Sequence, residues 1–74
     1  MKREIEVSIR FSNQAYEAME MVSFGYQGMR ILQTSTTTWE WEVEGNEEYE
    51  EDLQDDVKFA FTEAGIPEDE YYFK

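Results

Sequence analysis

The sequence predicts an α+β domain of the ferredoxin-like βαββαβ type. Three observations predict it: four segments have β-strand character, two segments have apolar residues at helical spacing, and 74 residues leave room for one domain, residues 1–74. Right-handed crossovers and short connections then favour a four-stranded antiparallel sheet with both helices on one face. We expect the first and third strands to lie side by side at its centre.

Alternation of polar and apolar residues predicts the strands. It is clearest at residues 4–11 and 39–44, the expected first and third strands. A β-prone run at 29–34 predicts the second strand, and the Ser/Thr-rich residues 34–38 are expected to turn the chain into the third. Residues 70–73 are the expected last strand. The core positions of the two central strands would be Ile5, Val7, Ile9, Trp39, Trp41 and Val43.

Capping residues and stop signals predict the two helices. Ser12 and Asn13 are candidate N-caps of the first helix, and Asn46 is a candidate N-cap of the second. The second helix should end at Gly65, which suits a left-handed position, because Pro67 cannot continue a helix. The apolar stripes are Ala15, Ala18, Met19 and Val22 in the first helix, and Tyr49, Leu53, Val57, Ala60, Phe61 and Ala64 in the second.

The net charge of -12 comes entirely from the second half of the chain. Residues 1–36 carry four bases and four acids, whereas residues 37–74 carry two bases and fourteen acids. Between residues 40 and 56, ten of seventeen residues are acidic and none is basic. Twelve aromatic residues argue against a disordered acidic tail. We therefore expect a folded protein that binds a basic partner.

In the predicted sheet, carboxylates of the central strands share the face that the helices leave uncovered, with no Lys or Arg interleaved among them. RNA-recognition modules of this topology use that face with aromatic and basic residues, so an acidic face would repel nucleic acid. Alternate strand residues are about 6.5 Å apart, which is of the order of phosphate spacing. Such a row would mimic a nucleic acid, and acids of the second helix would extend it. The candidate residues are Glu4, Glu6, Glu40, Glu42 and Glu44 on the sheet, and Glu48, Glu51, Asp52 and Asp55 on the helix.

Some aromatic residues fall outside the predicted core. Phe59 lies off the stripe of the second helix, and Tyr26 lies near the end of the first. Residues 71–73 are all aromatic and cannot all point inward from one strand. We expect that acids steer a partner and that Tyr72, Phe59 or Tyr26 hold it. Homodimerisation through the unpaired edge of the last strand is an alternative use of these residues.

Catalytic and metal-binding functions are not expected. The chain has no His or Cys, and paired carboxylates need a cleft with differently tuned environments to act in catalysis. The loop at residues 45–47 lacks the spacing of an EF-hand. No stretch approaches the roughly 20 apolar residues of a membrane span, and the first residues lack the apolar run of a signal peptide. We therefore expect a cytoplasmic protein without catalytic residues, metal, cofactor or membrane contact.

The short acidic chain, with the runs WEWEVE at 39–44 and EEYEED at 47–52, resembles small phage-encoded inhibitors of host defence. These are DNA-mimic antirestriction proteins and anti-CRISPR proteins, and the likeness is one of composition and size. It implies a non-catalytic inhibitor that occupies the nucleic-acid-binding surface of a host nuclease, CRISPR effector or related factor in the host cytoplasm. The alternative is a small dimeric structural or regulatory interaction module whose acids serve only solubility.

Overall fold

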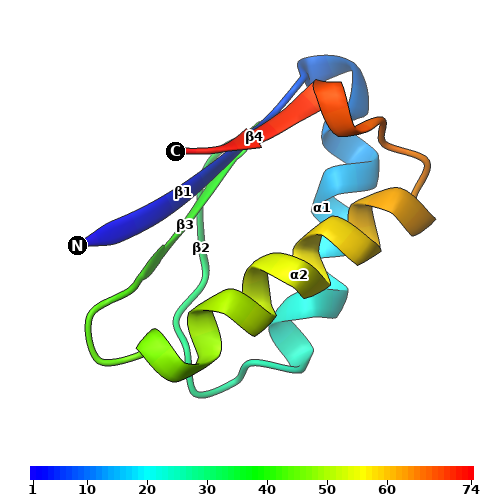
Figure 1. The fold of residues 1–74 in the computed structure, drawn as a ribbon. Coiled ribbons are helices and arrows are strands. Elements are labelled where there is room, and N and C mark those ends of the chain that lie inside the picture. Colours follow the sequence, from blue (N-terminus) through cyan, green and yellow to red (C-terminus); the bar gives the residue numbers. More distant parts are fainter.

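A computed structural model describes residues 1–74 and confirms one four-stranded antiparallel sheet with two helices, the predicted ferredoxin-like α+β arrangement (Figure 1). The strands are β1 (Lys2–Val7), β2 (Leu32–Ser35), β3 (Thr38–Glu42) and β4 (Tyr71–Phe73), in the sheet order β2-β3-β1-β4. The helices are α1 (Ser12–Phe24) and α2 (Glu47–Glu63), with short 3-10 helices η1 (Ile9–Phe11) and η2 (Glu68–Glu70). Every neighbouring pair of strands is antiparallel.

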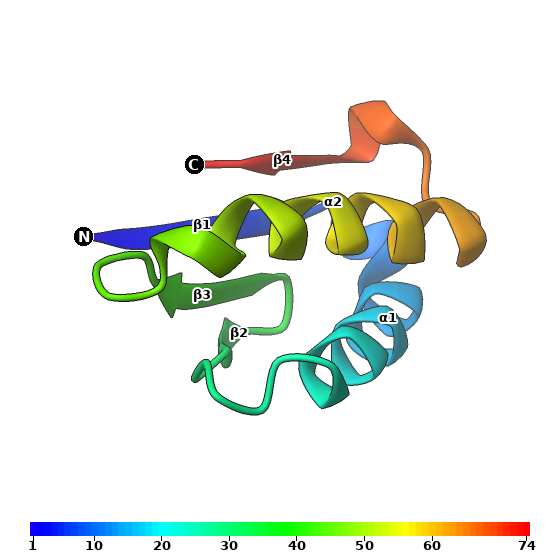
Figure 2. The same ribbon diagram turned by 60° about the horizontal axis from the view of Figure 1, so that its bottom comes forward.

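The core lies between the sheet and the helix layer. Figure 1 shows the sheet nearly edge-on with both helices on one side, and Figure 2 spreads the strands out in their order. The predicted stripe of α1 is buried throughout, and Trp39 and Trp41 of β3 are 4% and 1% exposed. The full set of buried apolar residues is Ile5, Val7, Ala15, Ala18, Met19, Val22, Met29, Trp39, Trp41, Leu53, Val57, Phe61 and Ile66.

The first strand is shorter than predicted. β1 ends at Val7, and Ile9 lies in η1 with 66% of its surface exposed, so its predicted place in the core is wrong. Neither neighbouring strand extends beyond this point. β3 begins at Thr38, which pairs with Glu6, and β4 begins at Tyr71, which pairs with Val7. Backbone groups beyond Ser8 have no strand to pair with and form a 3-10 turn that leads into α1.

The second and third strands also differ at their ends. β2 begins at Leu32 rather than at residue 29, and all four of its residues are exposed. Its pairing with β3 is irregular between Gln33 and Ser35. β3 ends at Glu42, so Glu44 lies in the turn that precedes α2.

Side-chain capping does not start either helix. Ser12 is the first residue of α1, and its backbone N–H donates to Ile9 O of the preceding turn, so the predicted caps at Ser12 and Asn13 are wrong. Asn46 does stand at the N-cap of α2, but its side-chain amide donates to Glu42 O at 3.0 Å. Both helices are entered from turns whose backbone carbonyls already accept helix N–H groups.

The buried stripe of α2 differs from the predicted one in the first turn of the helix. Tyr49 is 50% exposed, and Glu50 is buried beside it at 8% exposure. Leu53, Val57 and Phe61 are fully buried as predicted. Glu50 shares the side of the helix that buries Leu53 and Val57, and its carboxylate meets Arg3 of β1, a partner that apolar spacing alone does not reveal.

The end of α2 matches the prediction. Gly65 has φ 83°, and its N–H donates to Thr62 O at 3.1 Å. Ile66 N–H donates to Phe61 O at 2.9 Å, and both side chains are buried. This paired set of hydrogen bonds with its apolar contact is the Schellman motif, and it fixes the direction in which the chain leaves the helix.

Candidate functional site

The predicted sheet acids do lie together on the uncovered face. Glu4 of β1 pairs in register with Glu40 of β3, and Glu6 and Glu42 occupy the equivalent outward positions on their strands. Glu44 lies past the end of β3, in the turn before α2. The prediction that these carboxylates share one face of the sheet is therefore confirmed for four of the five residues.

Basic groups are interleaved with these carboxylates, contrary to the expectation from the sequence. Lys2 lies on the same face, with Nζ 3.2 Å from Glu40 Oε1. Lys74 follows β4 and places Nζ 2.8 Å from Glu6 Oε1 and 3.9 Å from Glu4 Oε1. The pairing of β4 with β1 brings Lys74 there, because its N–H donates to Glu4 O at 2.7 Å. The sheet face is thus a mixed surface in which each strand carboxylate has a nearby cation.

These contacts change the ionisation of the sheet acids. Hydrogen bonds from Lys74 and from the Tyr72 hydroxyl, at 3.1 Å, lower the pKa of Glu6. The Met1 amino group lies 2.7 Å from Glu42 Oε1 and lowers the pKa of that carboxyl. Tyr72 is 54% exposed, as expected for a contact residue, but its hydroxyl is already engaged within the sheet.

The outer edge of β4 has no neighbouring strand, and homodimerisation there stays a prediction.

The exposed acids of the helix layer, in contrast, have no ion pairs, and only the buried Glu50 of α2 has one. The predicted residues of α2 are all exposed and lie on the side of the helix that faces away from the sheet. α1 contains no base, and the single base of α2, Lys58, has Nζ 5.8 Å from the centroid of the Phe73 ring on β4. The acidic helix residues without an ion pair are Glu17, Glu20, Glu47, Glu48, Glu51, Asp52, Asp55, Asp56 and Glu63.

The structure therefore separates the two sets of predicted acids. The sheet set lies on the uncovered face of β1 and β3, and the α2 set lies on the opposite side of the molecule. Glu44 and Glu47 stand between them, where the chain passes from β3 into α2. The two sets do not form one continuous row on a single face.

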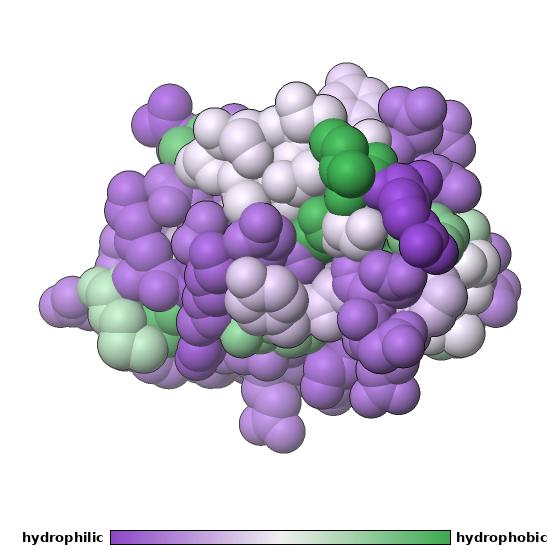
Figure 3. All heavy atoms as spheres, turned by 90° about the horizontal axis from the view of Figure 1, so that it is seen from above, coloured by the Kyte–Doolittle hydropathy of each residue, from purple (hydrophilic) through white to green (hydrophobic).

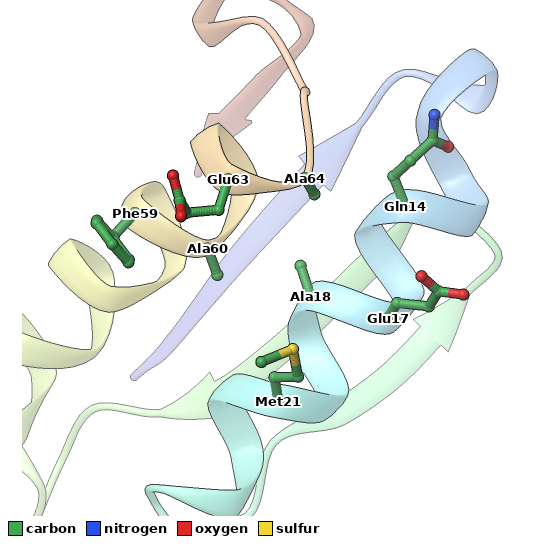
Figure 4. A pocket seen from close by; sticks show the side chains of 8 residues that line it. All are labelled: Gln14, Glu17, Ala18, Met21, Phe59, Ala60, Glu63 and Ala64. Atoms are coloured by element: carbon green, nitrogen blue, oxygen red, sulfur yellow. The ribbon is translucent and has the colours of Figure 1, made fainter.

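An apolar groove lies between α1 and α2 and was not predicted from the sequence. Its volume is about 410 Å³, and its floor is made of Ala18, Ala60 and Ala64 (Figure 4). Met21 and Phe59 line it and are 74% and 67% exposed. The polar side chains that complete the lining are Gln14, Glu17 and Glu63. On the face shown in Figure 3, hydrophilic residues cover much of the surface and the strongly hydrophobic areas are small.

A partly buried ion pair connects β1 to α2. Arg3 Nε lies 2.9 Å from Glu50 Oε1, and Gln54 Nε2 donates to both carboxylate oxygens at 2.7 and 2.8 Å. Burial raises the pKa of Glu50, but the bonds from Arg3 and Gln54 outweigh it, and the pKa is lowered. The Trp41 indole N–H also favours the ionised carboxylate, although its geometry falls short of a hydrogen bond and Nε1 has no partner. The inward position of Arg3 could be recognised from the sequence, because Arg3 is two residues before Ile5 on the same strand and therefore points to the same face.

Tyr26 is also engaged within the molecule. Its hydroxyl donates to Asp56 Oδ2 at 2.5 Å, and burial together with this bond raises the pKa of Tyr26. The contact ties the loop after α1 to the middle of α2. Phe24 and Phe59 are therefore freer than Tyr26 to contact a partner, since 74% and 67% of their surfaces are exposed.

Comparisons with known proteins give no relative. Searches of protein-family models, curated proteins and solved structures found no match to this chain. Neither helix has the length and apolar character needed to cross a membrane. The functional assignment therefore rests on the chain's own chemistry.

Proposed function

We propose that the protein is a non-catalytic inhibitor that binds the basic, nucleic-acid-binding surface of another protein through its helix layer. One observation carries this proposal: nine acids of α1 and α2 have no ion pair, whereas the strand acids of the open sheet face are each close to a cation. The resemblance to phage-encoded inhibitors points to a host nuclease or CRISPR effector as the class of target.

The unpaired helix acids are the groups that gain most from a basic partner. Four pairs of like charge stand at i, i+4 on α2, and each such pair destabilises a helix by about 0.2–0.5 kcal/mol. A Lys or Arg from a partner would relieve this repulsion. A sheet carboxylate would only exchange one exposed cation for another, since exposed ion pairs contribute about 0–1 kcal/mol. The four pairs are Glu47–Glu51, Glu48–Asp52, Glu51–Asp55 and Asp52–Asp56.

The spacing of these acids supports competition with nucleic acid. Residues at i and i+4 of a helix are separated by roughly 6 Å along its axis, from a rise of 1.5 Å per residue. Phosphates of one DNA strand rise about 3.4 Å per step and are farther apart through space. The outer face of α2 thus presents negative charges at a separation of the same order as a phosphate backbone.

An affinity capture with two charge-matched variants tests the proposal. The helix variant is E48Q/E51Q/D52N/D55N, and the sheet variant is E4Q/E6Q/E40Q/E42Q; each removes four negative charges and takes the net charge from -12 to -8. Immobilised wild type is exposed to bacterial lysate, and the captured proteins are identified by mass spectrometry. We expect a nucleic-acid-binding protein that is released by added DNA or RNA and by about 0.5 M salt.

The two variants separate position from total charge. We expect the helix variant to lose this capture and the sheet variant to keep it. Capture that is indifferent to DNA, RNA and salt, or that is lost only with the sheet variant, would contradict the proposal. Thermal unfolding of both variants is the control for folding.

A further inference from the structure

We infer that the groove between α1 and α2 binds an amphipathic helical segment of a protein partner, with apolar side chains in the groove and Lys or Arg at its margins. This inference deepens the proposed function and rests on it only in taking the partner to be a basic protein. It adds a second contact, apolar in character, beside the acidic outer face of α2.

The apolar part of the inference comes from the lining of the groove. Ala18, Ala60 and Ala64 keep the floor low, and Met21 and Phe59 stand beside it with most of their surface in water (Figure 4). Covering these two side chains is favourable in proportion to the apolar area removed from water. Met and Phe are also side chains enriched in the centres of protein interfaces. The groove thus offers an anchor of the kind that the charges alone do not supply.

The charge at the margins selects the partner. Glu17 on α1 and Glu63 on α2 are exposed and have no ion pair, and no Lys or Arg lines the groove. A segment with Lys or Arg beside its apolar residues would complement both margins. A second copy of this chain would bring its own acidic helices against them, and like charges brought together oppose such a complex.

The shape and chemistry of the groove favour a helix over a small ligand. It runs between two helices and is open to solvent, which suits a helix that inserts side chains at i, i+3 or i+4. Small-molecule sites instead hold convergent polar groups in an enclosed cavity. Here the polar groups are Gln14, Glu17 and Glu63, and all three are exposed.

An NMR titration with synthetic peptides tests the inference. The probe is a helical peptide with Leu on one stripe and Lys elsewhere, and its control is a peptide of the same composition whose order removes the stripe. We expect the striped peptide to shift the amide signals of Ala18, Met21, Phe59 and Ala60, and to bind more tightly than the shuffled peptide. Each of F59A and M21A should weaken its binding about tenfold.

Ile9→Ala is the matched control, because Ile9 is 66% exposed and does not line the groove. We expect it to leave the affinity unchanged. Equal binding of both peptides, no effect of F59A and M21A, or groove signals that shift with protein concentration alone would overturn the inference. The last result would indicate a second copy as the occupant.

The two proposals fail in different ways. If the peptide does not select the groove but capture is still released by nucleic acid, the inference is wrong and the proposed function stands. If the peptide binds the groove as described but no captured protein is released by DNA or RNA, the proposed function is wrong and the inference stands.

Discussion

At the scale of single residues, Glu50 is the acid with the most distinctive surroundings. It is 8% exposed, accepts hydrogen bonds from Arg3 and Gln54, and lies in the core-facing stripe of α2. The other helix acids face water without a cation. Glu50 is therefore a structural carboxylate, and the binding surface is built from its neighbours on the outer side of the same helix.

Replacing Glu50 by Gln should destabilise the protein by about 1–3 kcal/mol, because Arg3 is left partly buried without its counter-charge. Urea unfolding measures the change. Glu40→Gln is the control, since its partner Lys2 is largely exposed, and it should change stability by no more than about 1 kcal/mol. Equal effects of the two substitutions would contradict the structural role of Glu50.

The lowered pKa of Glu50 predicts a pH dependence. The ionised form is favoured in the folded state, so the stabilisation is present above the usual Glu pKa of 4.5 and is lost as pH falls through the lower folded value. The stability difference between wild type and E50Q should therefore shrink as the solution is acidified below 4.5. Urea unfolding over a pH series checks this, and a difference that stays constant would argue against it.

At the scale of elements, the end of α2 shows what the sequence predicts well. Gly65 and Pro67 act on the local backbone, so their effect is visible without knowledge of the rest of the fold. The burial of Glu50 in place of Tyr49 was not visible, because it involves the contact between Glu50 and Arg3, which are 47 residues apart. For the same reason, the alternation of polar and apolar residues up to Ile9 did not reveal that neither β3 nor β4 extends far enough to pair with Ile9.

Gly65→Ala tests the helix end. At φ 83° a side chain is strained, so we expect a loss of about 1 kcal/mol in the free energy of unfolding. Gly28→Ala is the matched control, because Gly28 does not have positive φ and an added Cβ meets no atom within 4 Å. Chemical denaturation of both variants is the measurement. A Gly65→Ala variant as stable as Gly28→Ala would show that the left-handed position is not needed.

At the scale of the whole molecule, the charge is divided between two unlike faces. The sequence predicted which acids would share the sheet face, because alternation fixes the side of each strand residue. It did not predict their pairing with Lys74, which is 70 positions from Glu4 along the chain and reaches it only through the register of β4 on β1. The groove was also hidden, since it depends on how α1 and α2 pack.

Net repulsion on the helix layer predicts an effect of salt on stability. Raising NaCl from about 0.01 M to about 0.15 M shortens the Debye length from about 30 Å to about 8 Å and screens the unpaired acids. We expect the free energy of unfolding to rise by about 1 kcal/mol, given four like-charge pairs on α2. The helix variant E48Q/E51Q/D52N/D55N should show a smaller rise than the sheet variant. Thermal unfolding of all three proteins at both salt concentrations is the measurement. A rise of equal size in the two variants would contradict this origin.

The most direct test of where the available negative charge lies is an NMR titration of the labelled protein with a short oligolysine. All residues of this probe are Lys, so it has no apolar face and no variation along its length. It therefore reports only which acids are free to bind a cation. We expect amide shifts on the outer side of α2, around Glu48, Glu51 and Asp55, with small changes at Glu4 and Glu40. Shifts that are as large on the sheet face, or larger, would contradict the assignment of the binding surface to the helix layer.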